Sequence, residues 1–159
     1  MATTIIDYYA LPESGEGKWP GRDAPANLTV KQKANSVNEA LTEDISNALG
    51  DNFNPARFIP NVIMYEFEGL LFSDCESFAV AIDRTDLRKE FQSIRDKFET
   101  PEDINDSYET APSKRVEKLV PRYQKPLHGN LAALEVGLKT IRLQVPIFSE
   151  WLSKLEAHP

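Results

Sequence analysis

Acidic side chains follow two apolar segments of the chain, at the points where strands are predicted to end. Asp7 follows the run Thr3–Ile6 within the predicted strand segment 3–9, and Glu66 and Glu68 follow the segment 58–65. In open α/β sheets, ligands bind beyond the carboxyl ends of the strands. Carboxylate oxygens are suited to Mg²⁺ or Mn²⁺, so Asp7 with Glu66 or Glu68 can converge on one divalent cation. All three are candidate metal ligands.

Simpler interpretations of these acids stay open. Asp7 can stabilise a local turn by accepting backbone N–H groups. If a helix begins after the segment 58–65, one of Glu66 and Glu68 faces the strand ends and the other faces away. A glutamate in a first helical turn is also favoured by the helix macrodipole alone.

A serine followed by two cations begins another predicted helix. Ser113, Lys114 and Arg115 precede an apolar-periodic segment that Pro121 stops. An N-cap serine here would bring a hydroxyl, free backbone amides and two positive charges near one point, which suits phosphate binding. The alternative is an ordinary capped helix with exposed basic residues.

His128 precedes a further helix and is a candidate acid/base or phosphate contact. A loop histidine can equally well only hydrogen-bond to the backbone. The candidate catalytic residues are therefore Asp7, Glu66 and His128. No Walker loop, GxSxG elbow, HExxH or GxGxxG is present in the sequence.

The net charge of −7 argues against a protein that simply coats nucleic acid. The charge is uneven, however, because residues 99–109 hold five acids and no base. A basic stripe follows, formed by Lys114, Arg115, Lys118, Arg122 and Lys125. Such a stripe can hold a phosphate backbone or can be a solvated helix face.

Length and composition indicate one soluble, cytoplasmic domain over residues 1–159. The chain is 41% hydrophobic, enough for one core but not two. No apolar run approaches the roughly 20 residues of a membrane helix, and the N-terminus does not resemble a signal peptide. Cys75 is the single cysteine, so no intrachain disulfide can form.

The elements that must position these residues are predicted to form a small α/β fold with a helix-rich C-terminal half. The segments 3–9 and 58–65 are nearly continuous apolar runs, typical of parallel strands buried on both faces. Residues 13–27 are predicted to be a loop. Thr29 and Gln32 form a capping-box pattern, which predicts a helix over 30–49 ended by Gly50. Two strands alone rarely make a stable sheet, so either further strands lie in the predicted loops or part of the sheet lies outside this chain.

Further helices are predicted from caps and periodicity. Ser73 and Glu76 form a second capping-box pattern, and Thr100 with Pro101 begins a short turn. One apolar stripe, predicted to be core, consists of Leu131, Leu134, Leu138, Ile141 and Val145.

The order of four motifs resembles a known family. They are TTIIDYYALP, RFIPNVIMYEFEGLLFSD, INDSYETAPSKR and PLHGNLAALEVGLKTIRLQVPIFSEWLSKLE, and they extend from Thr3 to about Glu156. Together they are similar to a Toprim-like bacterial family, domain-of-unknown-function family 4276. Genes of that family often lie beside those of AAA- or ABC-type ATPases, in settings that suggest defence against phage.

The resemblance implies a Toprim-like α/β domain with Mg²⁺- or Mn²⁺-dependent, nuclease-type activity on phosphodiesters. Asp7 matches the family's later acidic motif, although the usual Asp-x-Asp is reduced here to one acid, and Glu66 matches its strand-end glutamate. The other typical family residues match Ser113, Lys114, Arg115 and His128. Nucleic acid and an ATPase are the implied partners.

The sequence departs from the family at its start. Members begin with a strand and a Glu-Gly-x-Thr-Glu-like segment that supplies a metal-binding glutamate, and no such segment is present here. We therefore expect a sheet without its first strand and helix, and weak or absent activity of this chain alone. A misassigned start, a partner chain that supplies the segment, and a naturally inert form all fit. An exposed sheet edge would favour a homo-oligomer. The rival hypothesis is a non-catalytic interaction module that docks on a partner ATPase.

Overall fold

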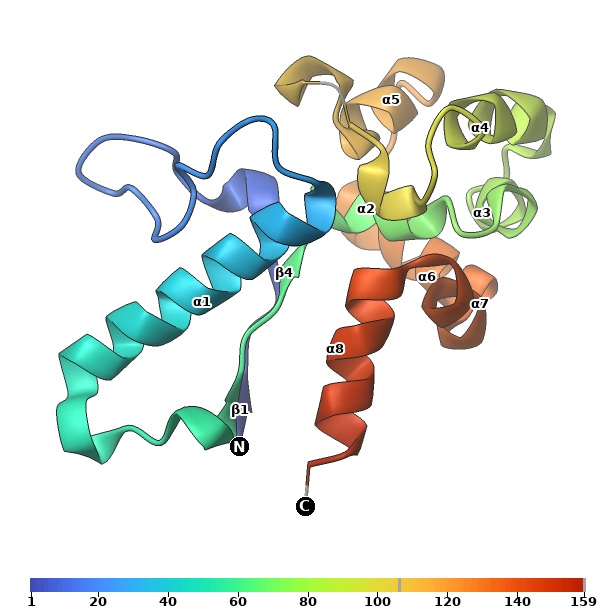
Figure 1. The fold of residues 1–159 in the computed structure, drawn as a ribbon. Helices are drawn as coiled ribbons and strands as arrows, with labels where there is room; N and C mark the ends of the chain where they lie inside the picture. Colours follow the sequence, from blue (N-terminus) through green and yellow to red (C-terminus); the bar gives the residue numbers. More distant parts are fainter. Residues whose placement is uncertain (106, 159) are drawn as a thin grey trace. The chain divides into compact units, whose positions relative to one another are not determined.

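The computed structural model describes residues 1–105 and 107–158. Within them the chain forms eight α-helices and four short strands, an α/β fold as predicted (Figure 1). Contacts divide the chain into two compact units, and each is described by itself. Unit 1 comprises Met1–Met64 and Glu150–Pro159, and unit 2 comprises Tyr65–Ser149.

The two predicted strand segments pair with each other in parallel inside unit 1. Strand β1 (Ala2–Thr3) pairs with β3 (Phe58–Ile59), and β2 (Ile6–Asp7) pairs with β4 (Val62–Ile63). The prediction of parallel pairing is confirmed. It places Asp7 at the last position of its strand, in register with Ile63.

The strand segments are interrupted at Pro60, which has no N–H to donate to the ladder. The Thr4 hydroxyl bridges this interruption. It accepts from the backbone N–H of Asn61 at 3.0 Å and donates to the Asn61 carbonyl at 3.2 Å. A side chain thus replaces ladder hydrogen bonds where the proline cannot make them.

Helix α1 (Val30–Leu49) follows the predicted bounds and the predicted cap. Gln32 N–H donates to the Thr29 hydroxyl at 3.2 Å, and Thr29 N–H donates to the Gln32 side chain at 2.9 Å. Gly50 ends the helix at a φ of +53°, which favours glycine. One face of the helix is buried, at Ala34, Val37 and Leu41.

The predicted loop between β2 and α1 is fixed by a buried arginine. The Arg22 guanidinium lies 3.7 Å from the centre of the Tyr8 ring. Its Nε donates to the Leu11 carbonyl at 2.9 Å, and its Nη2 forms an ion pair with Glu13 at 2.6 Å. Three partners for one buried cation hold the loop in one place.

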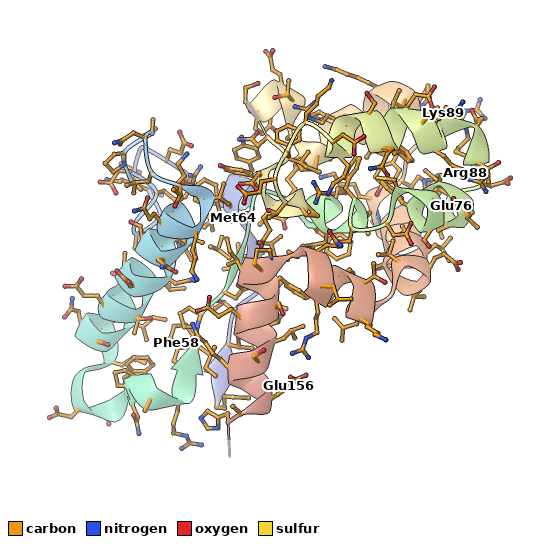
Figure 2. All side chains as sticks on the ribbon, turned by 45° about the vertical axis from the view of Figure 1, so that its right-hand side comes forward. Phe58, Met64, Glu76, Arg88, Lys89 and Glu156 are labelled. Atoms are coloured by element: carbon orange, nitrogen blue, oxygen red, sulfur yellow. The ribbon has the colours of Figure 1, made fainter. Side chains whose placement is uncertain are left out.

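Unit 2 is built from short helices around an aromatic cluster. Their bounds are α2 Phe67–Leu71, α3 Cys75–Ala81, α4 Arg88–Arg95, α5 Pro112–Leu119, α6 Asn130–Val136 and α7 Leu138–Gln144. Helix α8 (Pro146–Glu156) contains the boundary between the units. In the core, the Phe78 and Phe91 rings stack at 4.6 Å, and Phe72 meets both edge-on. An ion pair of 3.2 Å between Arg88 and Glu76 joins α4 to α3 on the surface (Figure 2).

Two predictions about this unit were wrong. The cap of α3 is Asp74, whose Oδ1 accepts the N–H groups of Glu76 and Ser77, and not Ser73. A carboxylate one residue later outcompetes the serine hydroxyl because it is the stronger acceptor.

The apolar stripe 131–145 is not one core-facing helix. Gly137, at a φ of +77°, separates α6 from α7 and changes the direction of the chain. Ile141 and Val145 are buried, but Leu134 is 80% exposed. Leu131 and Leu138 are also exposed. The periodicity alone did not reveal the break.

The prediction for the turn at Thr100 is confirmed, because a capping box joins Thr100 to Asp103. The acidic run 99–109 includes Asp106, which lies outside the described residues. In the part of the chain that the structure describes, no helix combines the length and the apolar character needed to cross a membrane.

Candidate functional site

Glu66 and Glu68 lie at the start of α2 in unit 2, and both side chains are buried. Glu66 immediately precedes the helix in extended conformation, and Glu68 is the second helical residue. Their side chains are only 11% and 3% exposed. Neither side chain points into solvent. Because a buried carboxylate is strongly disfavoured without a partner, the fold must supply positive charge here.

Lys125 supplies that charge. Its Nζ lies 3.4 Å from Glu66 Oε1 and 3.5 Å from Glu68 Oε2. Burial acts to lower the pKa of Lys125, but the negative charges of Glu68 and Glu66 outweigh it and raise the pKa above its ordinary value. The ammonium therefore bridges two carboxylates. Its own side chain remains 44% exposed.

Ser113 contacts this cluster through its backbone rather than its hydroxyl. The Ser113 N–H donates to Glu66 Oε2 at 2.9 Å. Sequence reasoning placed Ser113 at the N-cap, but Ala111 is the N-cap and Pro112 the first helical residue. Proline is well suited to the first helical position, so the helix begins early and Ser113 falls in its first turn. The Ser113 hydroxyl is buried and makes no hydrogen bond within the described chain.

The two cations after Ser113 point to different partners. Lys114 forms an ion pair with Glu117 at 2.8 Å. The hydrogen bond and charge of Glu117, with the charges of Tyr108 and Glu66, raise the pKa of Lys114. Arg115 instead donates from Nε to the Thr110 carbonyl at 2.6 Å and lies 5.2 Å from the Phe98 ring. Ser113 and Lys114 are thus close to Glu66, whereas Arg115 lines a separate groove on unit 2.

His128 is held by the turn that carries Lys125, a short π-helical turn over Lys125–Gly129. Its Nδ1 accepts the backbone N–H of Gln124 at 2.9 Å, so its Nε2 is the nitrogen that can exchange a proton elsewhere. The ring lies 5.4 Å from the ring of Tyr123. His128 therefore makes the kind of backbone hydrogen bond that the sequence analysis gave as the alternative to an acid/base function.

Tyr123 lies within the electrostatic influence of Glu68 and Glu66, and the sequence pattern did not single it out. Its hydroxyl is buried and has no hydrogen-bond partner within the described chain. Burial raises its pKa, and the charges of Glu68, Glu117 and Glu66 raise it further, so the phenol stays protonated. A protonated hydroxyl beside carboxylates is a donor available to an incoming anion or water.

Asp7 lies in unit 1, at the end of β2 as predicted, and its side chain is half-buried. Asp7 thus belongs to unit 1. Glu66, Glu68 and Lys125 belong to unit 2 and are called the Glu66–Glu68 cluster below, together with the neighbouring Ser113 N–H.

The Glu66–Glu68 cluster has the donor set of a small cation site. Two carboxylates share one cation there, while each side chain keeps most of its surface away from water. Among residues 1–105 and 107–158, no group of three or more His, Cys, Asp or Glu side chains gathers as a metal site would require. Mg²⁺, however, commonly uses one or two carboxylates and fills its remaining positions with water and phosphate oxygens. Glu66 and Glu68 are the residues that could serve as two such carboxylate ligands here.

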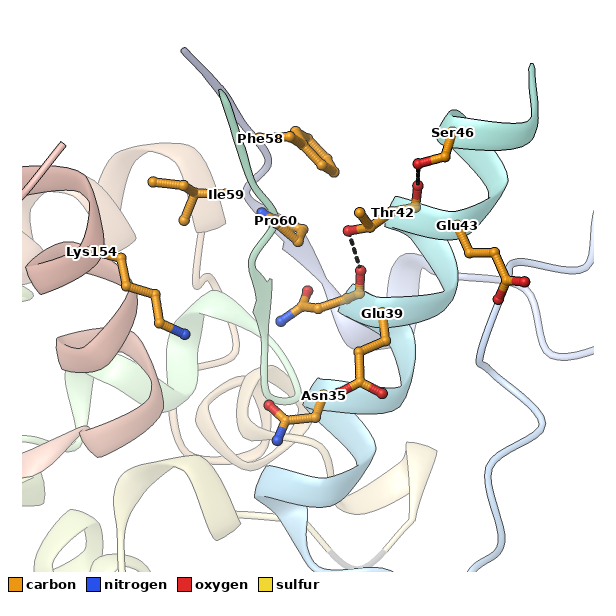
Figure 3. Close-up of a pocket in the computed structure, with 10 residues that line it drawn as sticks. Asn35, Glu39, Thr42, Glu43, Ser46, Phe58, Ile59, Pro60 and Lys154 are labelled. Carbon is orange, nitrogen blue, oxygen red and sulfur yellow. Dashed lines mark hydrogen bonds between the residues drawn. The ribbon is translucent and has the colours of Figure 1, made fainter. Parts of the chain in front are cut away.

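A second concave surface, of about 530 Å³, lies in unit 1 between α1 and the segment 58–60 (Figure 3). The Thr42 and Ser46 hydroxyls donate to carbonyls of their own helix, at 2.8 and 2.7 Å. They therefore present only acceptor lone pairs to the hollow. Phe58 and Pro60 form an apolar side. None of the candidate residues from the described chain lines this surface.

Comparison with known proteins identifies the family. A family model described as "Domain of unknown function (DUF4276)" matches residues 1–156. Searches of curated proteins and of solved structures gave no match. The match extends over nearly the whole chain and includes both strand segments, the Glu66–Glu68 cluster and α8. This chain belongs to the DUF4276 family.

Proposed function

We propose that the Glu66–Glu68 cluster is a divalent-cation site of nuclease type, which acts on phosphodiesters of nucleic acid. The observation that carries this proposal is the pair of buried carboxylates that share a single, half-exposed ammonium. Carboxylate oxygens are ligands suited to Mg²⁺ or Mn²⁺.

In this proposal Glu66 and Glu68 hold the cation. When bound, it would supply an activated water and would neutralise charge on the leaving oxygen. The Ser113 N–H keeps the Glu66 carboxylate in one orientation, because it occupies Oε2 and leaves Oε1 toward Lys125. The protein's own contribution is thus a fixed pair of ligands.

The same cluster offers groups for an anionic substrate. Ser113 lies in the first turn of α5, where the positive end of the helix macrodipole favours an anion. Lys114 and Lys125 are long cations near this point, each partly exposed. Tyr123 and His128 add a donor and an acid/base group on the neighbouring turn. Arg115 is assigned to phosphate binding only by the sequence pattern.

Three parts of the proposal depend on the family resemblance alone. They are a ligand function for Asp7, an ATPase partner, and a place in phage defence. The reduced acidic motif at Asp7 leads us to expect slow turnover by this chain by itself.

The direct test is cleavage of fluorescently end-labelled single-stranded DNA, duplex DNA and RNA, with Mg²⁺, Mn²⁺ or EDTA. We expect slow, metal-dependent cleavage that Glu68→Gln abolishes and EDTA stops. The matched control is Glu135→Gln, an exposed glutamate of α6 in the same unit. Asp7→Ala tests the remaining predicted ligand. Cleavage that survives Glu68→Gln unchanged would contradict the assignment.

A second candidate function has one observation in its favour. Helices α6 and α7 expose Leu131, Leu134 and Leu138, and exposed apolar side chains can belong to an interaction surface. A non-catalytic module that docks on a partner ATPase would use such a face. Salt-sensitive binding of DNA by the isolated chain would argue against this function, whereas indifference to metal and nucleic acid would favour it.

A further inference from the structure

The hollow between α1 and the segment 58–60 is lined on its helical side by hydrogen-bond acceptors (Figure 3). The Thr42 and Ser46 hydroxyls already donate to carbonyls of α1, so they can only accept from a ligand. Asn38 lines the same hollow, and its Oδ1 is buried with no hydrogen-bond partner in the described part of the chain. Because an unpaired buried acceptor costs free energy, a ligand that supplies N–H donors is favoured here.

Two carboxylates of α1 add negative charge to this lining. Glu39 and Glu43 both line the hollow, and neither forms an ion pair with another described residue. Lys154 is the cation among the described residues that line the hollow, and its ammonium pairs within its own helix with Glu150 at 3.1 Å. The lining is therefore suited to a cation that carries N–H groups.

The opposite side of the hollow is apolar. It consists of Phe58, Ile59 and Pro60, and the Phe58 ring meets the Phe53 ring edge-on at 5.9 Å. An apolar wall favours the methylene groups of a ligand, and an aromatic ring in that wall favours a nearby cation. The volume of about 530 Å³ falls within the range of small-molecule sites, about 300–1,000 Å³.

Polar side chains recur along this face of α1 once in each helical turn. They are Asn35, Glu39, Thr42 and Ser46, and a spacing of three or four residues places them on one side of the helix. Linear polyamines carry ammonium groups separated by three or four methylene groups, a distance close to one helical turn of about 5.4 Å. The hollow thus matches a polyamine in the spacing of its acceptors and in its apolar wall.

We propose that the hollow in unit 1 binds a linear polyamine such as spermidine. The ammonium groups donate to Asn38, Glu39 and Thr42. The methylene groups pack against Phe58 and Pro60. The hollow shares no residue with the candidate cation site of unit 2, so this inference does not rest on the proposed function.

The experiment is isothermal titration calorimetry of the chain, freed of nucleic acid and metal, with spermidine at low ionic strength. Hexamethonium is the matched ligand, because it carries two positive charges on a methylene chain but has no N–H group. The variants are Glu39→Gln, Thr42→Val and the control Asp44→Asn, an exposed acid of α1 outside the hollow. We expect each of the first two to weaken spermidine binding about fivefold, and the control to change it less than about twofold. Hexamethonium should bind at least about tenfold more weakly than spermidine.

Several results would overturn the inference. They are the absence of saturable spermidine binding, equal affinity for hexamethonium, and equal affinities of Glu39→Gln and Asp44→Asn. A blocked tripeptide with a central lysine tests whether a protein side chain is the occupant instead, and binding as tight as that of spermidine would overturn the assignment to a free polyamine. Glu39 is exposed, so Glu39→Gln keeps the comparison valid if Thr42→Val folds poorly. The assay contains no metal, so its failure leaves the cation site of unit 2 untouched.

Discussion

The carboxylate of Glu102 accepts the backbone N–H of Ile147 at 2.9 Å. Its other oxygen accepts the N–H of Phe148 at 3.0 Å, and the glutamate is only 3% exposed. Both N–H groups belong to the first turn of α8, behind Pro146. First-turn N–H groups have no partner within their own helix, so a glutamate 45 residues earlier in the chain completes the start of α8.

Glu102→Ala should therefore destabilise the protein by about 1–3 kcal/mol, because it removes a charged acceptor from two half-buried N–H donors at the start of α8. The free energy of unfolding of the variant and of the wild type is measured by chemical denaturation followed by circular dichroism. Glu99→Ala, an exposed acid of the same segment, should change the free energy of unfolding by less than about 0.5 kcal/mol. Equal effects of the two substitutions would show that the cap is unimportant.

Gly21 should be intolerant of a side chain for a reason that Gly15 lacks. Both have positive φ, +76° and +83°. A Cβ at Gly21 would lie 2.4 Å from the Ser36 carbonyl oxygen of α1, whereas a Cβ at Gly15 meets nothing within 4 Å. Gly15→Ala should cost about 1 kcal/mol for the backbone alone. Gly21→Ala should cost at least about 2 kcal/mol more, because the loop must shift off the helix.

Cys75 should be unreactive in the folded protein. Burial raises the pKa of its thiol to about 12, so at pH 8 almost none of it is thiolate, the reactive form. A raised pKa means that reactivity grows only as the pH approaches 12. We expect Ellman's reagent at pH 8 to react rapidly with the Cys75 thiol in denaturant. Without denaturant, the same thiol should react slowly. Rapid reaction of the native protein would contradict the burial of this side chain.

Because the chain breaks at Gly137, we expect the side chains before and after the break to contribute unequally to the free energy of unfolding. Leu134→Ala should change the free energy of unfolding by less than about 0.5 kcal/mol, because the side chain is 80% exposed. Ile141→Ala should cost about 2–4 kcal/mol, because a buried aliphatic side chain is lost. If both substitutions destabilise alike, α6 and α7 bury the same face and the break has no energetic effect.

The parts of the fold that could be predicted from the sequence are those with local signals. Helix α1 begins and ends where Thr29 and Gly50 predict, because a capping box and a positive-φ glycine act within a few residues. The parallel strand pairs followed from continuous apolar runs. Ser113 was misplaced by a local competitor, since Pro112 fixes the first helical position.

The site itself depended on contacts that leave no local signal. Glu66 was identified because it follows a strand segment, but Lys125 lies 59 residues away from it in the chain. Lys125 was visible only as the last member of a basic stripe, with nothing in its neighbours to indicate a buried partner. Tyr123 was missed for the same reason, since the charges that raise its pKa come from Glu68 in α2 and Glu117 in α5.

The contact between the Ser113 N–H and Glu66 has a consequence for how this family can vary. Since the donor is a main-chain group, nineteen of the twenty genetically encoded residues retain it, and only proline removes it. The side chain at position 113 is therefore constrained by its volume, and not by its chemistry, in orienting Glu66. A homologue with alanine there would keep the glutamate oriented as well as this chain does. Comparison of residue identity alone would mistake such a homologue for one that has lost a functional serine.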